Sequence, residues 1–490
     1  MRTAIVTIVL SFMMAAMGLA MSITSASGAT MDSQLTKSNR ATVQCSDATF
    51  IRRTSLLLTG ELPTADRVAT FLESKSSKKR AELIDELLDS DSYVRYMQLR
   101  WGDILRIKAE FPSNLWPNGV QAYNQWLYHH LLDNTPYDKM VRDLLISTGS
   151  NFKDPAVNFY RAFLQRTPEA IYENINLLFL GQRSCSDNGY ECFSQIRYKS
   201  TKEWKEEIIY LDVNKMSGSV PQVTLSDKTK LTLPERGDWR VAYVDWLTTQ
   251  KQFAGVMVNR AWYWIFGQGL VNEPDDWRGD NPASEPKLLE HLTTYFIKSG
   301  YDMRGLMRYI LLSDCYGAEA RVGSMFEPRR LPAEVIVDAL ADVTGFSNSY
   351  QSRVPEPFTF YPPKSRSRDL GDATVSSSAL ELFGKPSRDV SLESQRNSSI
   401  TSRQLLFLMN SSQLEMQIRH SKLYTEAKAS GGTSREMIDR VMLATLSRRA
   451  TDSEVAMFEE YAKSSGVQLQ QALIDIIWVA INSNEFLYIY

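Results

Sequence analysis

The stretch "VMVNRAWYWIFG", Val256–Gly267, decides the fold class of this chain. Its apolar residues recur every three or four positions, so one face of a helix holds Met257, Val258, Ala261, Trp262, Ile265 and Phe266. Gly267 predicts the end of that helix, because glycine readily adopts the left-handed conformation of a C-cap. Similar stripes lie on both sides of this stretch, and the sequence therefore predicts a mainly α-helical fold.

Helical periodicity predicts further elements in both halves of the chain. Thr64 is expected to cap a helix near the N-terminus, and Ser284 to cap the helix that follows Pro286. Further helices are predicted in the N-terminal half at about residues 119–133, 136–147 and 168–181. Three more are predicted to close the chain at about 434–447, 452–464 and 468–484.

The pattern changes between the two helical halves. "IIYLDV" (208–213) and "QVTL" (222–225) combine β-branched residues with nearby turn signals, which predicts short strands. We therefore expect a two-domain helical protein with a small β-hairpin insert between the halves. Its expected parts are a signal peptide (1–29), an N-terminal helical domain (48–205), a β insert or linker (206–236) and a C-terminal helical domain (237–490) that includes a loop arm (346–400).

The first residues have the order of a secretory signal. Arg2 precedes the apolar run Ala4–Met21, and the small residues of "SITSASGAT" (22–30) follow. An uncleaved anchor helix is the alternative, but the small residues favour cleavage. We therefore expect a periplasmic or extracellular protein without stable membrane insertion after signal cleavage.

Composition narrows the classes of partner. The 490 residues are 43% hydrophobic and carry a formal net charge of −2, which is typical of a globular protein with a large core. This balance gives no reason to expect nucleic acid as a partner.

Two of the four cysteines lie in "GQRSCSDNGYECFSQ", Gly181–Gln195. Covalent haem attachment needs Cys-x-x-Cys-His, whereas Cys185 and Cys192 are separated by six residues and Phe193 follows. Zinc would need two further ligands. A turn between the two cysteines can bring them together, so we predict a Cys185–Cys192 disulfide and no cofactor. Whether Cys45 pairs with Cys315 stays open.

Acidic residues are the only candidates for catalysis. Asp275 and Asp276 lie in the carboxylate-rich loop "NEPDDWRGDNPASEP" (272–286). Such a loop could hold calcium, but helix capping and solvation explain it better, and we predict no metal site. Asp103 is a third candidate, although its place one turn before Arg106 favours a structural ion pair.

Aromatic residues in loops are the candidates for binding. They could stack on sugar rings or on a partner, or cover the core from outside. These residues are Trp116, Trp277, Phe358, Phe360 and Tyr361.

Several segments together resemble a family of secreted planctomycete and verrucomicrobial cytochrome-associated proteins with two tandem domains of unknown function. Three segments are similar to the first domain of that family: "FIRRTSLLLTGELPTADRVATFL" (50–72), "NTPYDKMVRDLL" (134–145) and "ENINLLFLGQRSC" (173–185). Three later segments are similar to its second domain: residues 256–277, "EPRRLPAEVIVDAL" (327–340) and "LFGKPSRD" (382–389).

The resemblance implies a helical fold and a co-encoded secreted protein as partner, but no established activity. The family commonly carries Cys-x-x-Cys-His at the place of Cys185, and here the second cysteine is displaced and the histidine is missing. A second family histidine is replaced by Glu285, within Ser284-Glu285-Pro286. A haem or metal role is therefore not expected in this chain.

Taken together, the sequence favours an extracytoplasmic, non-catalytic binding or structural protein that engages a secreted partner or a surface polymer. The loop 272–286 and the arm 346–400 are the expected contact surfaces. One alternative is a hydrolase of an extracellular polymer that uses the loop carboxylates. A weaker alternative is electron transfer, as the family resemblance implies.

Overall fold

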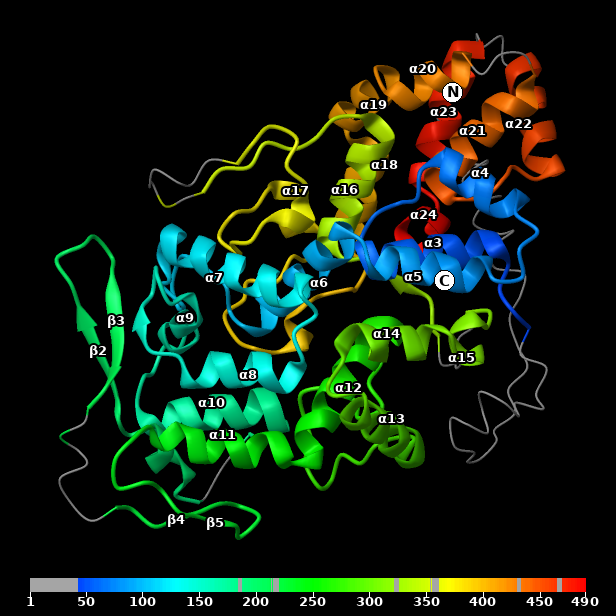
Figure 1. The fold of residues 1–490 in the computed structure, drawn as a ribbon. Coiled ribbons are helices and arrows are strands. Elements are labelled where there is room, and N and C mark those ends of the chain that lie inside the picture. The colour runs from blue at the N-terminus through cyan, green and yellow to red at the C-terminus, as the bar shows by residue number, and fades with distance from the viewer. Residues whose placement is uncertain are drawn as a thin grey trace.

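A computed structural model describes most of the chain after residue 42. The described residues are 43–183, 187–212, 214, 220–320, 326–352, 354, 361–429, 433–464 and 469–490. The predicted signal peptide lies outside them. Within them the protein is mainly α-helical, as predicted (Figure 1).

Eight helices of the described residues form the N-terminal half. Four of them begin at side-chain caps. Ser46 accepts from the Thr49 amide, and Thr64 accepts from the Arg67 amide, which confirms the predicted cap. The helices are α3 (Asp47–Thr59), α4 (Ala65–Glu73), α5 (Lys79–Leu88), α6 (Asp91–Ile104), α7 (Trp116–Leu132), α8 (Tyr137–Ile146), α9 (Asn158–Arg161) and α10 (Pro168–Leu180).

Small sheets separate the halves, as expected, although the pairing starts earlier than residue 206. Strand β2 (Ile196–Ser200) pairs antiparallel with β3 (Glu207–Leu211), with Ile196 opposite Leu211, and β1 (Gly149–Ser150) pairs with the other edge of β3. A second hairpin joins β4 (Val223–Thr224) to β5 (Lys230–Leu231). The predicted strands around 208–213 and 222–225 are therefore present, and the partner of the first lies in the segment assigned to the N-terminal domain.

The C-terminal half is again helical. Gly267 ends α12 with φ 82°, as predicted, but Ser284 does not cap α13, because its hydroxyl donates to the Leu270 carbonyl instead. The helices are α11 (Trp239–Thr249), α12 (Lys251–Phe266), α13 (Pro286–Lys298), α14 (Met303–Leu311), α15 (Asp314–Gly317), α16 (Ala333–Thr344), α17 (Ser378–Leu382), α18 (Ser402–Asn410), α19 (Ser412–Arg419), α20 (Lys422–Ala429), α21 (Ser434–Leu446), α22 (Asp452–Ser464), α23 (Leu469–Ile481) and α24 (Asn484–Leu487).

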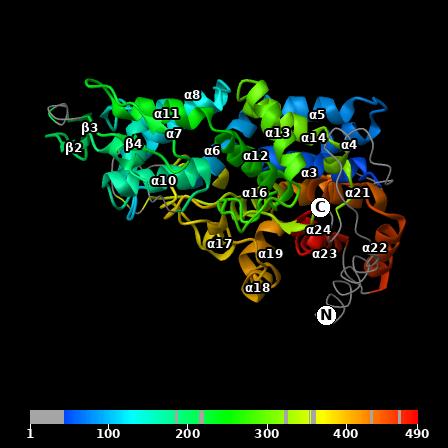
Figure 2. The ribbon, with the colours of Figure 1, turned by 90° about the horizontal axis from the view of Figure 1, so that it is seen from below.

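The two halves share one hydrophobic core rather than packing as separate bodies. Its buried side chains form a continuous cluster that extends from Cys45 to Ile489. Helix α4 packs on α21 and α5 packs on α14, so the first described helices lie between elements of the C-terminal half (Figures 1 and 2). Strand β6 (Arg329–Arg330) pairs with β7 (Tyr488–Ile489), which brings the last residues back against the entry to α16.

A glycine marks one close contact between the halves. Gly181 follows α10 with φ 66°, and a Cβ placed there would lie 2.6 Å from Cδ1 of Trp277 and 2.9 Å from its Cβ. The Trp277 amide donates to the Gly181 carbonyl at 3.2 Å. The indole of Trp277 also contacts Gly255 of α12. Trp277 is therefore wedged between the end of the N-terminal half and α12.

We predict that Gly181→Ala lowers the free energy of unfolding by at least about 2–3 kcal/mol, since alanine meets both an unfavourable backbone conformation and the Trp277 side chain. Gly300→Ala is the matched control, because Gly300 has φ 72° but no atom would lie within 4 Å of a Cβ added there. This control variant should lower the free energy of unfolding by only about 1–2 kcal/mol, because alanine at this position meets the unfavourable backbone conformation but no neighbouring atom. Urea unfolding measures both, and equal costs would contradict the Trp277 contact.

Candidate functional site

Asp103 is a buried structural anion at the centre of the molecule. It is 4% exposed, and its two carboxylate oxygens accept from Arg388 Nε at 2.8 Å and Arg396 Nε at 2.6 Å. The sequence correctly predicted an ion pair for Asp103, but Arg106 was the wrong partner. Arg106 instead donates to Ser391 and Asn174. Asp103 therefore binds residues almost 300 positions away in the sequence.

The two loop carboxylates are also held by arginines. Asp275 is buried, pairs with Arg260 at 3.0 Å and accepts the Glu393 amide at 2.7 Å. Asp276 pairs with Arg278 at 2.8 Å. In the described ranges, no three His, Cys, Asp or Glu side chains are grouped so that they could hold a metal ion. The three candidate acids thus serve as anchors for arginines in this structure.

The arm, residues 346–400, is largely irregular as predicted, and its described parts include both exposed and buried residues. Arg388 is buried and Arg396 is partly buried, and Arg396 also pairs with Glu334 of α16 at 2.8 Å. Although burial opposes ionisation, the charge of Arg396 lowers the pKa of Glu334 to about 2. Ion pairing with both α6 and α16 ties this part of the arm, around Arg388 and Arg396, to the helices.

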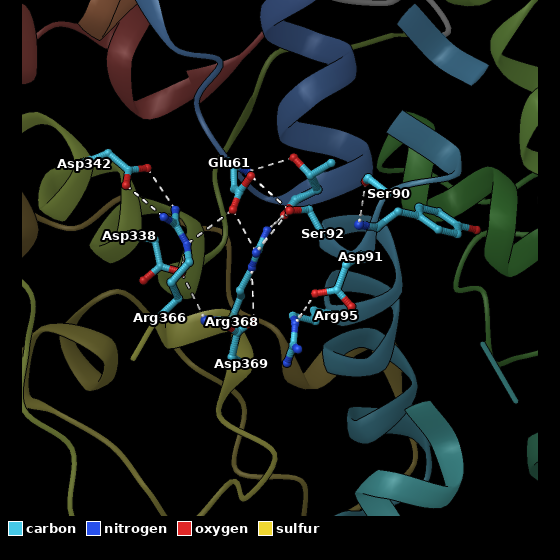
Figure 3. A network of polar contacts seen from close by, with 12 residues as sticks. Glu61, Ser90, Asp91, Ser92, Arg95, Asp338, Asp342, Arg366, Arg368 and Asp369 are labelled. Atoms are coloured by element: carbon cyan, nitrogen blue, oxygen red, sulfur yellow. Dashed lines mark hydrogen bonds and ion pairs between the residues drawn. The ribbon is translucent and has the colours of Figure 1, made fainter. Parts of the chain in front are cut away.

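A second polar network fixes the middle of the arm (Figure 3). Arg368 pairs with Glu61, after α3, at 2.8 Å, and Arg366 pairs with Asp342 of α16 at 2.9 Å. The Ser367 amide donates to Asp338 at 2.6 Å, and burial raises the pKa of Asp338 to about 6. The arm therefore bridges the N-terminal and C-terminal halves a second time.

The predicted Cys185–Cys192 disulfide is not shown by the structure, because Cys185 lies outside the described residues. Cys192 is fully buried in a 3-10 turn, and burial raises the pKa of its thiol to about 12. Among the described residues, Cys45, Cys192 and Cys315 form no disulfide with one another. The Cys45 amide donates to the Gly317 carbonyl at 2.9 Å, so the segments of Cys45 and Cys315 are neighbours without a bond between the two sulfurs.

The predicted binding aromatics lie in different environments. Trp277 is the half-buried wedge between Gly181 and α12, and Tyr361 packs partly buried against the core. Phe358 and Phe360 lie outside the described residues. Among the described members of the predicted set, Trp116 alone contacts a largely exposed aromatic partner. The structure therefore does not bring the set together.

Trp116 belongs to a surface cluster that we call the aromatic platform, formed by the exposed Trp204 and the partly buried Trp116 and Lys205. The two indoles meet edge to face, with ring centroids 6.2 Å apart. Trp204, in the turn between β2 and β3, is 68% exposed. The Lys205 ammonium lies 3.9 Å from the Trp116 centroid and 4.9 Å from that of Trp204. The platform thus joins the start of α7 to the tip of the hairpin, at one edge of the molecule (Figure 1).

The backbone holds the platform in an unusual conformation. Trp116 has φ 63° and Lys205 has φ 60°, in the left-handed region that bulky residues rarely adopt. Such positions cost of order 1–3 kcal/mol each and occur preferentially at functional sites. The sequence does carry a signal for Trp204, which stands as a lone tryptophan among charged residues beside the predicted insert.

We predict that Asp103→Asn lowers the free energy of unfolding by about 3–5 kcal/mol, because it leaves buried arginines without their full counter-charge. Arg95→Ala is the control, since it removes the exposed Asp91–Arg95 pair and should cost no more than about 1 kcal/mol. Denaturant unfolding measures both variants. An unchanged midpoint for Asp103→Asn, with loss of a polymer-degrading activity, would instead indicate a catalytic acid.

Two family models match the chain in tandem. Residues 29–182 match PSCyt2, a protein of unknown function (DUF1549), and residues 239–462 match PSD1, a protein of unknown function (DUF1553). No curated protein and no solved structure matches the chain. The order agrees with the resemblance seen in the sequence, and the chain therefore carries a PSCyt2 domain followed by a PSD1 domain.

Proposed function

We propose that this protein is an extracytoplasmic, non-catalytic binding protein that holds a surface polysaccharide on its aromatic platform. The observation that carries the proposal is the pair of indoles formed by the exposed Trp204 and the partly buried Trp116, with the Lys205 ammonium close to both rings. A secreted protein partner, implied by the family resemblance, is the other occupant to test.

The platform has the chemistry that a sugar chain requires. An indole is a rigid, flat surface that binds an apolar ring face with little loss of side-chain entropy. The two ring planes are inclined at 75°, and Lys205 lies over one face of each indole, so a sugar ring would stack on the face of Trp204 that Lys205 does not cover. Lys205 adds a hydrogen-bond donor and a positive charge for hydroxyl or acidic substituents. A polymer is favoured over a small sugar because the platform is open.

The hydrolase alternative has weaker support. A polymer hydrolase usually needs a pair of carboxylates free to exchange protons or attack the substrate. Asp103, Asp275 and Asp276 are instead each bonded to arginine. Electron transfer also lacks a specific observation, since the Cys-x-x-Cys-His pattern is missing from the sequence.

The expected location rests on the N-terminal sequence. The order of charge, apolar run and small residues at 1–29 supports export, and a surface polymer would then be accessible to the mature protein. Among the helices that the structure describes, none is both long and apolar enough to cross a membrane.

The proposal predicts that Trp204→Ala weakens polymer binding about tenfold, because loss of one stacking contact costs about 1–1.5 kcal/mol. Co-sedimentation with insoluble cellulose, chitin and peptidoglycan provides the measurement. Phe346→Ala is the control, since Phe346 is also an exposed aromatic residue but follows α16, outside the platform. The control should bind as the unmodified chain does.

The variant Lys205→Met tests how much the positive charge of Lys205 contributes to polymer binding, apart from stacking on the indoles. It should weaken binding to an acidic polymer and leave binding to a neutral polymer nearly unchanged. If none of the three polymers retains the unmodified protein, or if Trp204→Ala and Phe346→Ala bind equally, the platform is not a polysaccharide site.

A further inference from the structure

A cavity lies where helix α3 meets the last residues of the sequence. Its volume is about 580 Å³, within the range typical of small-molecule sites. It is lined by the start of α3, by residues 319–320, by the segment after α21 and by residues 482–485. These segments come from both halves, so the cavity exists only in the folded full chain.

Two adjacent arginines of α3 line this cavity, and both are almost completely buried. Arg52 donates to the carbonyls of Thr445 at 2.9 Å and Phe486 at 3.0 Å. Arg53 donates to the carbonyl of Ala318 at 2.9 Å and also to those of Tyr316 and Tyr490. Both acceptors of Arg52 are neutral backbone carbonyls, so these bonds position its guanidinium without neutralising its charge. Arg53 differs, because one of its acceptors is a backbone oxygen of Tyr490, the last residue of the sequence, where a free chain end carries a carboxylate.

Both arginines also keep unused hydrogen-bond donors. Arg52 Nε and Arg53 Nη2 are buried and have no hydrogen-bond partner in the described part of the chain. An unsatisfied buried donor on a charged group is costly, and an oxyanion would supply the acceptor that these two nitrogens can use. Burial lowers the pKa of Arg52 to about 10, so it stays protonated at neutral pH. The ring of Phe326, 4.0 Å from the Arg53 guanidinium, gives that charge partial compensation.

The other lining side chains suit an organic anion. Arg448 is already engaged by Glu454 and Glu485, at 2.8 and 2.7 Å. Glu319 and Glu485 are the acids among the lining residues, against three arginines, of which Arg448 also pairs with Glu454 outside the lining. The first turn of α3 adds the positive end of a 13-residue helix. Apolar contacts are available from Ala48, Ala320, Leu446 and Val479.

We propose that this cavity binds a small organic acid, with its carboxylate or phosphate group at Arg52 and Arg53 and its apolar part against Leu446 and Val479. A planar guanidinium favours such oxyanions because it donates two parallel hydrogen bonds. The proposal does not depend on the aromatic platform, which lies on the hairpin.

Calorimetric titration of the full-length protein with benzoate and, separately, inorganic phosphate tests the proposal. We expect saturable binding of at least one probe, with a matching rise in the unfolding temperature. Benzoate alone would identify the site as one for carboxylates with an apolar body, whereas phosphate alone would identify a phosphate site. The absence of saturable binding of either probe at millimolar concentration overturns the proposal.

A matched pair of variants at Ala48 tests whether the bound ligand is negatively charged, and it leaves the buried arginines unchanged. Ala48 is half-buried in the first turn of α3 and lines the cavity. Ala48→Glu should weaken binding about five- to tenfold through repulsion, and Ala48→Lys should strengthen it or leave it unchanged. Arg52→Lys keeps the charge, loses the planar donor pair and should weaken binding. Equal effects of the two Ala48 variants would show that the cavity does not recognise an anion.

Discussion

Asp103 imposes the constraint on which the rest of the structure depends. A carboxylate at the centre of a core is expensive unless cations and hydrogen bonds surround it, and Arg388 and Arg396 provide both. Arg396 extends the network to Glu334. Because these arginines come from an irregular segment, satisfying Asp103 draws that segment into the interior between α6 and α16. The burial of one acid on an N-terminal helix thus fixes the position of the arm.

Arginines link distant segments throughout the fold. Arg240 donates to the carbonyls of Ile146 and Ser147 at the end of α8, and Arg330 donates to the carbonyl of Phe383. Arg52 and Arg53 join α3 to the final turns of the chain in the same way. A helix end leaves carbonyls without partners, and a guanidinium can satisfy several of them at once. The same use of arginine produces both the tight connection between the halves and the charged cavity.

Local patterns predicted most of the helical framework and little of the candidate site. Apolar periodicity located α12 and the closing helices, and Thr64 and Gly267 marked helix ends correctly. Helices α18–α20 were missed, because they are short and lie beside an irregular segment. The long-range ion pairs could not be predicted, since charge alone does not reveal which arginine meets which acid. Trp116 was found from its loop position, whereas its contact with Trp204 depends on the hairpin reaching α7.

The two family domains, although separate in sequence, form one body through the shared core and the arm. Differential scanning calorimetry of the full chain tests this most directly, by comparing the calorimetric enthalpy with the van't Hoff enthalpy. A single unfolding transition with equal enthalpies is expected, because neither half keeps its buried charges paired without the other. Two resolved transitions, one for each domain, would contradict it.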